Sequence, residues 1–353
     1  MKGEKIKLEI NFTRTNGPLD DDIEKLMSLA GDIQHPDIVR EMILAALKAG
    51  IENTGKSDRA NLKLMNTTLK EMRFTSKIFN PYRDRKKVTV FGSARTSPDE
   101  KVYHMAKTFG QRLAEAGYMV ITGAGGGIMQ AVNEGAGTEN SFGVNIRLPF
   151  EQRANPVLTG NPRLIIYKYF FSRKVAFLRE ADAIALFPGG FGTLDEAMET
   201  LTLLQTGKNN IIPLLMIDEP GGTYWERCIA FFRKELLNRH YIGESDFLLF
   251  DRVHSVDEAV EKITRFYRRY HSTRYVDGRT VIRLLTPLSR ECAEGLRKDF
   301  SSLLAPGGEM FLSGHLPEEA DESNIAGLQR LVIDFNRWDY GQLRKLIDAV
   351  NDA

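Results

Sequence analysis

Short apolar runs alternate with helical segments through the middle of the chain, from residue 88 to about residue 270. Runs of this length suit buried strands, and the segments between them have the apolar spacing of helices. Strands that alternate with helices form parallel sheets with helices on both faces. The pattern therefore predicts an α/β domain with a mostly parallel sheet, and its predicted strands lie at 88–94, 118–122, 141–149, 164–170, 181–187 and 211–218.

The segments on either side of this middle part have different patterns. Residues 1–86 have apolar positions at helical spacing, such as Ile38 and Met42, and end in the charged stretch NPYRDRKK. After residue 271, an Asp-Gly pair between β-rich flanks indicates a hairpin, followed by a helix near 288–300, two strands and a final helix. We therefore predict a helical extension at 1–86, the α/β domain at 87–271 and a small α+β module at 272–353.

Small residues follow three of the predicted strands, at the carboxyl ends where open α/β sheets bind ligands. The loop PGGFGT at 188–193 joins a strand to a helix, and its Gly189, Gly190 and Gly192 allow a ligand to approach the backbone closely. Backbone N–H groups at such a helix start bind anions, typically phosphate. We predict a phosphate site here, with a glycine-rich turn of purely structural purpose as the alternative.

Two further strand ends can line the same crevice. TGAGGGIM at 122–129 is a second glycine loop, and FGSART at 91–96 offers the hydroxyl of Ser93. The second loop is not a dinucleotide fingerprint, because Ile128 takes the place of the third glycine, and no GK[ST] follows as in a Walker A loop. The loops therefore favour a nucleotide with one phosphate over NAD or ATP.

Glu196 follows the phosphate loop within the next predicted helix. Thr193 and Glu196 have the T-x-x-E spacing of a capping box, in which Glu196 would only bond back to the helix start. Glu196 also lies off the predicted apolar stripe of this helix, which runs from Leu194 to Leu204. A carboxylate beside a phosphate weakens its binding, which favours a contact with another part of the ligand, such as ribose. Both interpretations remain open.

Arg173 and Lys174 lie at the start of the predicted helix after YKYFF. Phe171, Val175 and Leu178 have the spacing of a core-facing stripe, and Arg173 lies away from it. Positive charges at a helix start oppose the helix dipole. A nearby phosphate or carboxylate would explain their position, and a solvated basic pair is the alternative.

Composition and charge exclude several other classes of function. The net charge of +1 and the absence of recognition motifs disfavour nucleic acid as a partner. No apolar run is long enough to span a membrane, and the N-terminal residues do not resemble a secretory signal. Two cysteines and six histidines show no metal-ligand spacing, so we predict no metal and no cofactor. Low cysteine content fits a cytoplasmic location.

Taken together, these motifs resemble the LONELY GUY (LOG) family of Rossmann-like phosphoribohydrolases, which release base and ribose 5-phosphate from nucleoside monophosphates. Residues 188–196 match every fixed position of the family signature PGGxGTxxE. A GS strand end, a GGG-x-M loop and an Arg-Lys pair are also present in order, and the resemblance covers about residues 88–270. It implies a doubly wound sheet, a nucleoside monophosphate as substrate and assembly as a homodimer or larger homo-oligomer.

The resemblance also implies roles for individual residues. Arg173 and Glu196 fall on the catalytic positions of the family. Residues implied to bind substrate or phosphate are Ser93, Gly126, Gly127, Met129, Glu151, Lys174, Gly189, Gly190, Gly192, Thr193 and Thr202. An older label for the family, lysine decarboxylase, does not fit, because the sequence has no strong pyridoxal-phosphate lysine signature.

The chain departs from short plant-type family members in two respects. Phe170-Phe171-Ser172 precedes the Arg-Lys pair where those members have a Met-His run, and both flanking segments are extra. The stretch NIRLPFEQ is closer to the larger bacterial nucleotide monophosphate nucleosidases. These differences argue against a cytokinin riboside monophosphate as the preferred substrate. A nucleotide-binding or sensing protein without turnover is the rival function, because fold alone does not determine function.

Overall fold

The structure is a computed structural model that describes residues 18–52, 55, 58–149 and 153–353. The chain forms two compact units, residues 1–71 and 72–353, and the division between them falls within helix α3 (Arg59–Phe79). None of the helices in the described ranges has the length and apolar character needed to cross a bilayer.

The first unit is helical, as the sequence predicts. It contains α1 (Pro18–Ala30), α2 (Pro36–Glu52) and the start of α3. Ile23, Met27 and Leu44 form a small buried core between α1 and α2. Arg40 on α2 adds an ion pair with Asp20 on α1, with 2.5 Å between nitrogen and oxygen. This core is small, so few apolar contacts hold the unit together.

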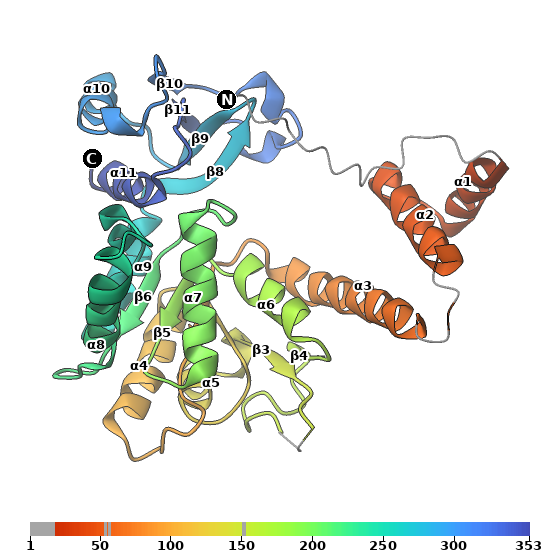
Figure 1. The fold of residues 1–353 in the computed structure, drawn as a ribbon, viewed down its shortest axis with the longest axis horizontal. Coiled ribbons are helices and arrows are strands. Elements are labelled where there is room, and N and C mark those ends of the chain that lie inside the picture. The colour runs from red at the N-terminus through yellow and green to blue at the C-terminus, as the bar shows by residue number, and fades with distance from the viewer. Residues whose placement is uncertain (1–17, 53–54, 56–57, 150–152) are drawn as a thin grey trace. The chain divides into compact units, whose positions relative to one another are not determined.

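A seven-stranded parallel sheet forms the centre of the second unit (Figure 1). Its strand order is β4-β3-β2-β1-β5-β6-β7, which confirms the predicted Rossmann-like α/β fold. The strands are β1 (Lys87–Phe91), β2 (Met119–Thr122), β3 (Ser141–Ile146), β4 (Leu164–Tyr167), β5 (Ala183–Leu186), β6 (Leu214–Ile217) and β7 (Asp251–Val253). The prediction missed β7, because three residues with two charges, Asp251 and Arg252, give no apolar run.

Helices cover both faces of this sheet. One face is covered by α4 (Lys101–Glu115), α5 (Ile128–Ala136) and α9 (Val256–Phe266), which pack with Ala183 and Ala185 of β5. The other face is covered by α6 (Phe170–Arg179) and α7 (Phe191–Gln205), which pack with Ile184 and Leu186 of the same strand. Alternate strand residues therefore enter different cores, as the period of two requires. Figure 1 shows α6 and α7 beside each other, and both supply residues to the candidate site described below.

A second, antiparallel sheet follows in the same compact unit. It contains β8 (Tyr270–Val276), β9 (Arg279–Leu284), β10 (Met310–Ser313) and β11 (Gln329–Ile333), in the order β10-β11-β9-β8, with α10 (Arg290–Asp299) and α11 (Tyr340–Asp352). The predicted hairpin is confirmed: Asp277 and Gly278, with φ of 44° and 87°, form the turn between β8 and β9. The division of the chain at 86/87 and 271/272 remains a prediction.

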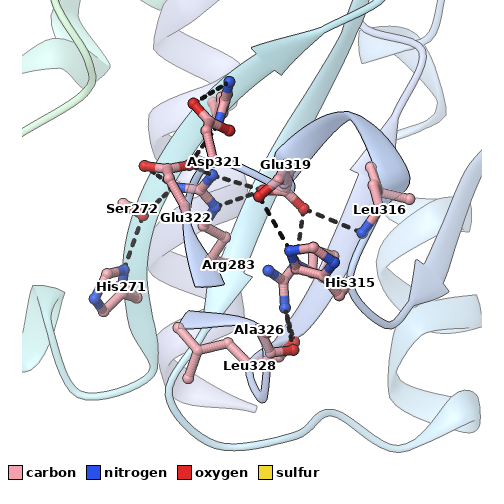
Figure 2. A network of polar contacts seen from close by, with 12 residues as sticks. His271, Ser272, Arg283, His315, Leu316, Glu319, Asp321, Glu322, Ala326 and Leu328 are labelled. Carbon is pink, nitrogen blue, oxygen red and sulfur yellow. Dashed lines mark hydrogen bonds and ion pairs between the residues drawn. The ribbon is translucent and has the colours of Figure 1, made fainter. Parts of the chain in front are cut away.

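A buried ionic network ties a long loop to this smaller sheet (Figure 2). The Glu319 carboxylate is fully buried and contacts Arg283 of β9 at 2.6 Å and Arg330 of β11 at 3.0 Å. Burial alone would raise the pKa of Glu319, but hydrogen bonds from both arginines hold that pKa below its usual value. Removing one partner of such a network leaves a buried charge uncompensated, at a cost of about 3–5 kcal/mol.

Helices α4 and α5 approach each other closely because both carry glycine at the contact. A Cβ atom on Gly110 would lie 2.2 Å from the carbonyl oxygen of Val132, and one on Gly135 would lie 1.8 Å from the carbonyl oxygen of Lys107. Backbone atoms cannot move aside as a flexible side chain can. The packing of α4 on α5 therefore depends on these two glycines.

We predict that Gly135→Ala destabilises the protein by about 1–3 kcal/mol, the usual cost of overpacking. Gly295→Ala in α10 is the matched control, since a Cβ there meets nothing within 4 Å. Helix propensity alone would stabilise both variants by about 0.5–1 kcal/mol. Denaturant unfolding monitored by circular dichroism measures both, and equal stabilisation of the two variants would contradict the close-packing explanation.

Candidate active site

Three strand ends meet at Ser93. The Ser93 N–H donates to the carbonyl of Pro188 after β5, and the Ser93 carbonyl accepts from the N–H of Ile128 at the start of α5, both at 3.0 Å. Gly127 has a φ of 62°, and a Cβ on it would lie 2.2 Å from the Ser93 carbonyl oxygen. A side chain at Gly127 would therefore separate the strand ends.

The glycine loop at 188–193 is held from a fourth element, α8 (Tyr224–Phe231). The Tyr224 hydroxyl donates to the carbonyl of Gly189 at 2.7 Å. Asp218, after β6, accepts from the N–H of Trp225 and from Arg252, which fixes the start of α8. Sequence analysis missed Tyr224, because its bond to Gly189 spans 35 residues and leaves no local pattern.

A cavity of about 830 Å³ opens at this edge of the sheet, within the size range of small-molecule sites. The predicted residues that line it are Ser93, Met129, Arg173, Gly189, Gly190, Gly192, Thr193 and Glu196. Lining residues that the sequence analysis did not select as site residues include Arg95, Phe170, Phe191, Asp195 and Tyr224. Most of the predicted site residues therefore come together around one cavity, from the ends of β1, β2 and β5 and from α6.

The other predicted site residues have different surroundings. Gly126 and Gly127 do not line the cavity. Gly127 instead lets its backbone lie close to the backbone of Ser93, where a side chain would clash. Lys174 lies beside Glu196 but is also absent from the cavity wall. Thr202 is exposed, lines a separate apolar pocket and donates to the carbonyl of Met198 at 2.8 Å. Glu151 lies outside the described residues.

Helix α7 begins earlier than a capping box at Thr193 requires. Its N-cap is Gly190 and its first residue is Phe191, so Thr193 is already the third helical residue, and its N–H donates to the carbonyl of Gly190 at 3.0 Å. The capping-box interpretation of Thr193 and Glu196 is therefore wrong. The helix starts within the glycine loop, whose Gly190, Phe191 and Gly192 line the cavity.

Glu196 is on the buried face of α7, not off it as the sequence pattern indicated. Thr193, Glu196, Ala197 and Thr200 are buried, so polar residues take part in the inward stripe, and only 6% of Glu196 is exposed. Its Oε2 atom is buried and has no hydrogen-bond partner among the residues that the structure describes. Burial raises the pKa of Glu196 to about 7, although the Lys174 charge opposes that rise. A carboxyl group with such a pKa can change its protonation state near neutral pH.

Arg173 comes from α6 and reaches the same cavity. Its Nε donates to the Val144 carbonyl at 2.9 Å, and burial lowers the pKa of its guanidinium while the Glu196 charge opposes that effect. A Cβ on Gly123 would lie 2.6 Å from Arg173 Nη2, so this glycine makes room for the arginine. The guanidinium is thereby anchored to the sheet and faces the cavity.

The predicted core stripe of α6 is wrong at two of its three positions. Phe171 and Val175 are 47% and 46% exposed, whereas Leu178 is buried. The buried residues of α6 are instead Ser172, Ala176, Phe177 and Leu178. The true inward face is therefore rotated by about one residue, which leaves two large apolar side chains on the surface.

Comparison with known proteins agrees with this geometry. Residues 128–263 match a family model described as "Possible lysine decarboxylase", the older label of the LOG family. The predicted LOG resemblance is confirmed. The matched stretch of the chain contains Met129, Arg173 and the loop from Gly189 to Glu196, so the LOG motifs and the cavity coincide.

Two curated relatives match about two fifths of the chain. One, from Escherichia coli K12, is named pyrimidine/purine nucleotide 5′-monophosphate nucleosidase, and it is 30% identical over 41% of this chain and 35% of its own length. The other, from Oryza sativa subsp. japonica, is named "Probable cytokinin riboside 5′-monophosphate phosphoribohydrolase LOGL5", with 31% identity over 39% of this chain and 56% of its own. The matches thus span about a third and about half of the two relatives.

Two solved structures are similar to about half of the chain. The X-ray structure of TM1055 is 26% identical and covers 51% of this chain and 99% of its own, with a TM-score of 0.36. A molybdenum cofactor carrier protein from Chlamydomonas reinhardtii is 16% identical, with 51% and 97% coverage and the same TM-score.

Because burial raises the pKa of Glu196 from 4.5 to about 7, the folded protein holds this proton more tightly than the unfolded chain. Folding stability therefore falls as pH rises from 4.5 to 7, and the loss, up to about 3 kcal/mol, is complete above pH 7. We predict that Glu196→Gln is more stable than the parent protein at pH 8, and that this advantage disappears toward pH 4.

Guanidinium unfolding of both proteins across this pH range measures the difference. The low-pH values serve as the internal control, since Glu196 is then protonated in both states. A stability difference that does not vary with pH would show that the Glu196 carboxylate is not desolvated as described.

Proposed function

We propose that this protein hydrolyses the N-glycosidic bond of a nucleoside 5′-monophosphate, giving free base and ribose 5-phosphate. The observation that carries the proposal is Glu196, a buried carboxyl group with one oxygen that has no partner among the described residues, in a cavity that the start of α7 also lines. A buried polar atom that lacks a hydrogen-bond partner in the free protein is unfavourable, and a bound ligand that supplies the partner would explain why it is there.

The phosphate would bind at Gly190, Gly192 and the start of α7, where backbone N–H groups have no partner within the helix. Water attacks C1′ of the ribose while the bond from C1′ to the base nitrogen breaks, and that nitrogen takes the bond's electrons. One proton of the water is lost, and the departing base gains one. The transition state resembles an oxocarbenium ion, as in other glycoside cleavages.

Glu196 would act on the reacting atoms, and Arg173 would bind the substrate. An ionised Glu196 would stabilise the positive charge at C1′ or accept the proton of the attacking water. Arg173, anchored through Val144, would bind the phosphate or ribose and orient Glu196. The two relatives, named as a nucleotide 5′-monophosphate nucleosidase and a probable cytokinin riboside 5′-monophosphate phosphoribohydrolase, support this class of reaction.

We predict that the purified chain releases base and ribose 5-phosphate from at least one of AMP, GMP, CMP, UMP and a cytokinin riboside monophosphate. Glu196→Gln should lower kcat at least about 100-fold, the usual contribution of a positioned acid or base. Chromatography of the base and a colorimetric assay of ribose 5-phosphate measure the products.

Glu180→Gln is the matched control. Glu180 is a half-buried glutamate whose pKa burial also raises, but it lies at the far end of α6 and does not line the cavity. It should leave turnover unchanged. Normal turnover by Glu196→Gln would contradict a catalytic role for Glu196. Tight binding of one nucleotide with no release from any would favour the rival function, nucleotide sensing.

We further propose that the chain assembles as a homodimer or larger homo-oligomer. Phe170, Phe171 and Val175 on α6 expose about half of each side chain, and exposed apolar groups of this size are typical of association surfaces. We predict a mass of at least twice 39.9 kDa by light scattering, reduced by Phe171→Glu together with Val175→Glu. A monomeric parent protein would contradict the proposal. The cytoplasmic location remains a prediction.

A further inference from the structure

Lys174 lies among three carboxylates of the neighbouring helix. Its Nζ is 2.6 Å from Glu199 Oε2, 2.9 Å from Asp195 Oδ2 and 3.5 Å from Glu196 Oε1. Only 16% of the Lys174 side chain is exposed. Its donors are thus directed at α7, and Lys174 is not part of the cavity wall, whereas its sequence neighbour Arg173 is.

The three carboxylates lie close together on α7. Residues three and four apart are neighbours on a helix surface, so Glu199 is next to both Asp195 and Glu196. Three like charges at this spacing destabilise one another, and Lys174 is the cation that contacts them all. Asp195 and Glu199 hold the ammonium in place, and Glu196 is the most buried member of the group.

We propose that Lys174 is a positioning residue that sets the charge state of Glu196, and that it does not bind the substrate phosphate. The proposal deepens the function proposed above, because it concerns the same carboxyl group. It replaces the substrate contact that the LOG resemblance implies for Lys174. The lysine would act through Glu196, since it contacts that side chain and its ammonium is engaged by the three carboxylates of α7.

Among the described residues, four charged groups act on Glu196, and they do so in opposite directions. Burial raises the pKa of Glu196 most, Lys174 and Arg173 from α6 lower it, and Glu199 and Asp195 on α7 raise it. Glu199 raises the pKa of Glu196 in two ways. Its negative charge repels that of Glu196, and it lies closer to the Lys174 ammonium, at 2.6 Å, than Glu196 does, at 3.5 Å. Removing Lys174 or removing Glu199 should therefore move the Glu196 titration in opposite directions.

The test is a direct titration of Glu196 in the full chain without substrate. Carbon-13 NMR of protein labelled at glutamate Cδ resolves the carboxyl signals, and the signal lost in Glu196→Gln identifies Glu196. We expect Lys174→Met to raise the Glu196 midpoint above about 7 by about one pH unit, a tenfold change in ionised fraction. We expect Glu199→Gln to lower it. Lys174→Arg should restore most of the parent value.

Lys107→Met is the matched control, since Lys107 also pairs with a glutamate, Glu134 at 3.1 Å, but between α4 and α5. It should leave the Glu196 midpoint unchanged. Shifts of the same sign in Lys174→Met and Glu199→Gln, or no shift in either, would overturn the proposal. So would a tenfold loss of affinity for ribose 5-phosphate in Lys174→Met at a pH where Glu196 is ionised in both proteins.

The titration needs no turnover, so it separates this proposal from the proposed reaction. If the parent protein releases no base from any nucleotide, the reaction fails as a proposal while the NMR midpoints still decide the role of Lys174. If the protein is active, kcat/KM should fall on the acidic side of its pH profile. The pH midpoint of that fall should be higher in Lys174→Met and lower in Glu199→Gln than in the parent protein. A change in KM alone would contradict the positioning role.

Discussion

The two backbone hydrogen bonds of Ser93 are the constraint on which the candidate site depends. They join the end of β1 to the loop after β5 on one side and to the start of α5 on the other. Because Gly127 has no side chain, its backbone can approach the Ser93 carbonyl. Wider separation of these strand ends would move the glycine loop away from Met129, and the cavity wall would no longer be continuous.

Burial of Glu196 is the second constraint, and it acts against stability. A carboxyl group that is desolvated and flanked by Asp195 and Glu199 is costly to ionise, and the cations of α6 offset only part of that cost. Proteins retain unfavourable groups of this kind where function requires them. Helices α6 and α7 therefore interact through charge as well as packing, because Lys174 of α6 forms ion pairs with the carboxylates of α7.

The sequence predicted the larger features of the fold and the location of the site. Apolar runs gave six of the seven strands, and the glycine loops and PGGxGTxxE gave the residues that meet at the cavity. Short-range patterns were less reliable for which way a side chain faces. Phe171 and Val175 have core spacing but are exposed, and Glu196 is polar but buried, because the sheet and not the helix's own periodicity decides which face is covered.

Contacts between distant segments could not be predicted from local patterns. The bond from Tyr224 to Gly189 spans α7 and β6, and the ion pairs of Lys174 join α6 to α7 across β5. The spacing T-x-x-E was misleading at Thr193 for a related reason. Glycine at 190 and 192 lets the helix begin before the threonine, so the side chain that would have capped the helix is already inside it.

One helix carries both the glycine loop, the proposed phosphate site, and the buried carboxyl group of Glu196. Gly190 and Glu196 are six residues apart on α7, which corresponds to about 9 Å of rise. An anion seated at the loop would therefore fix how far along the bound molecule Glu196 reaches. A free nucleoside has no phosphate to bind at the loop, so its position relative to Glu196 would not be fixed. A triphosphate would bring further negative charge toward Asp195 and Glu196. Selection by length and charge would then precede any recognition of the base.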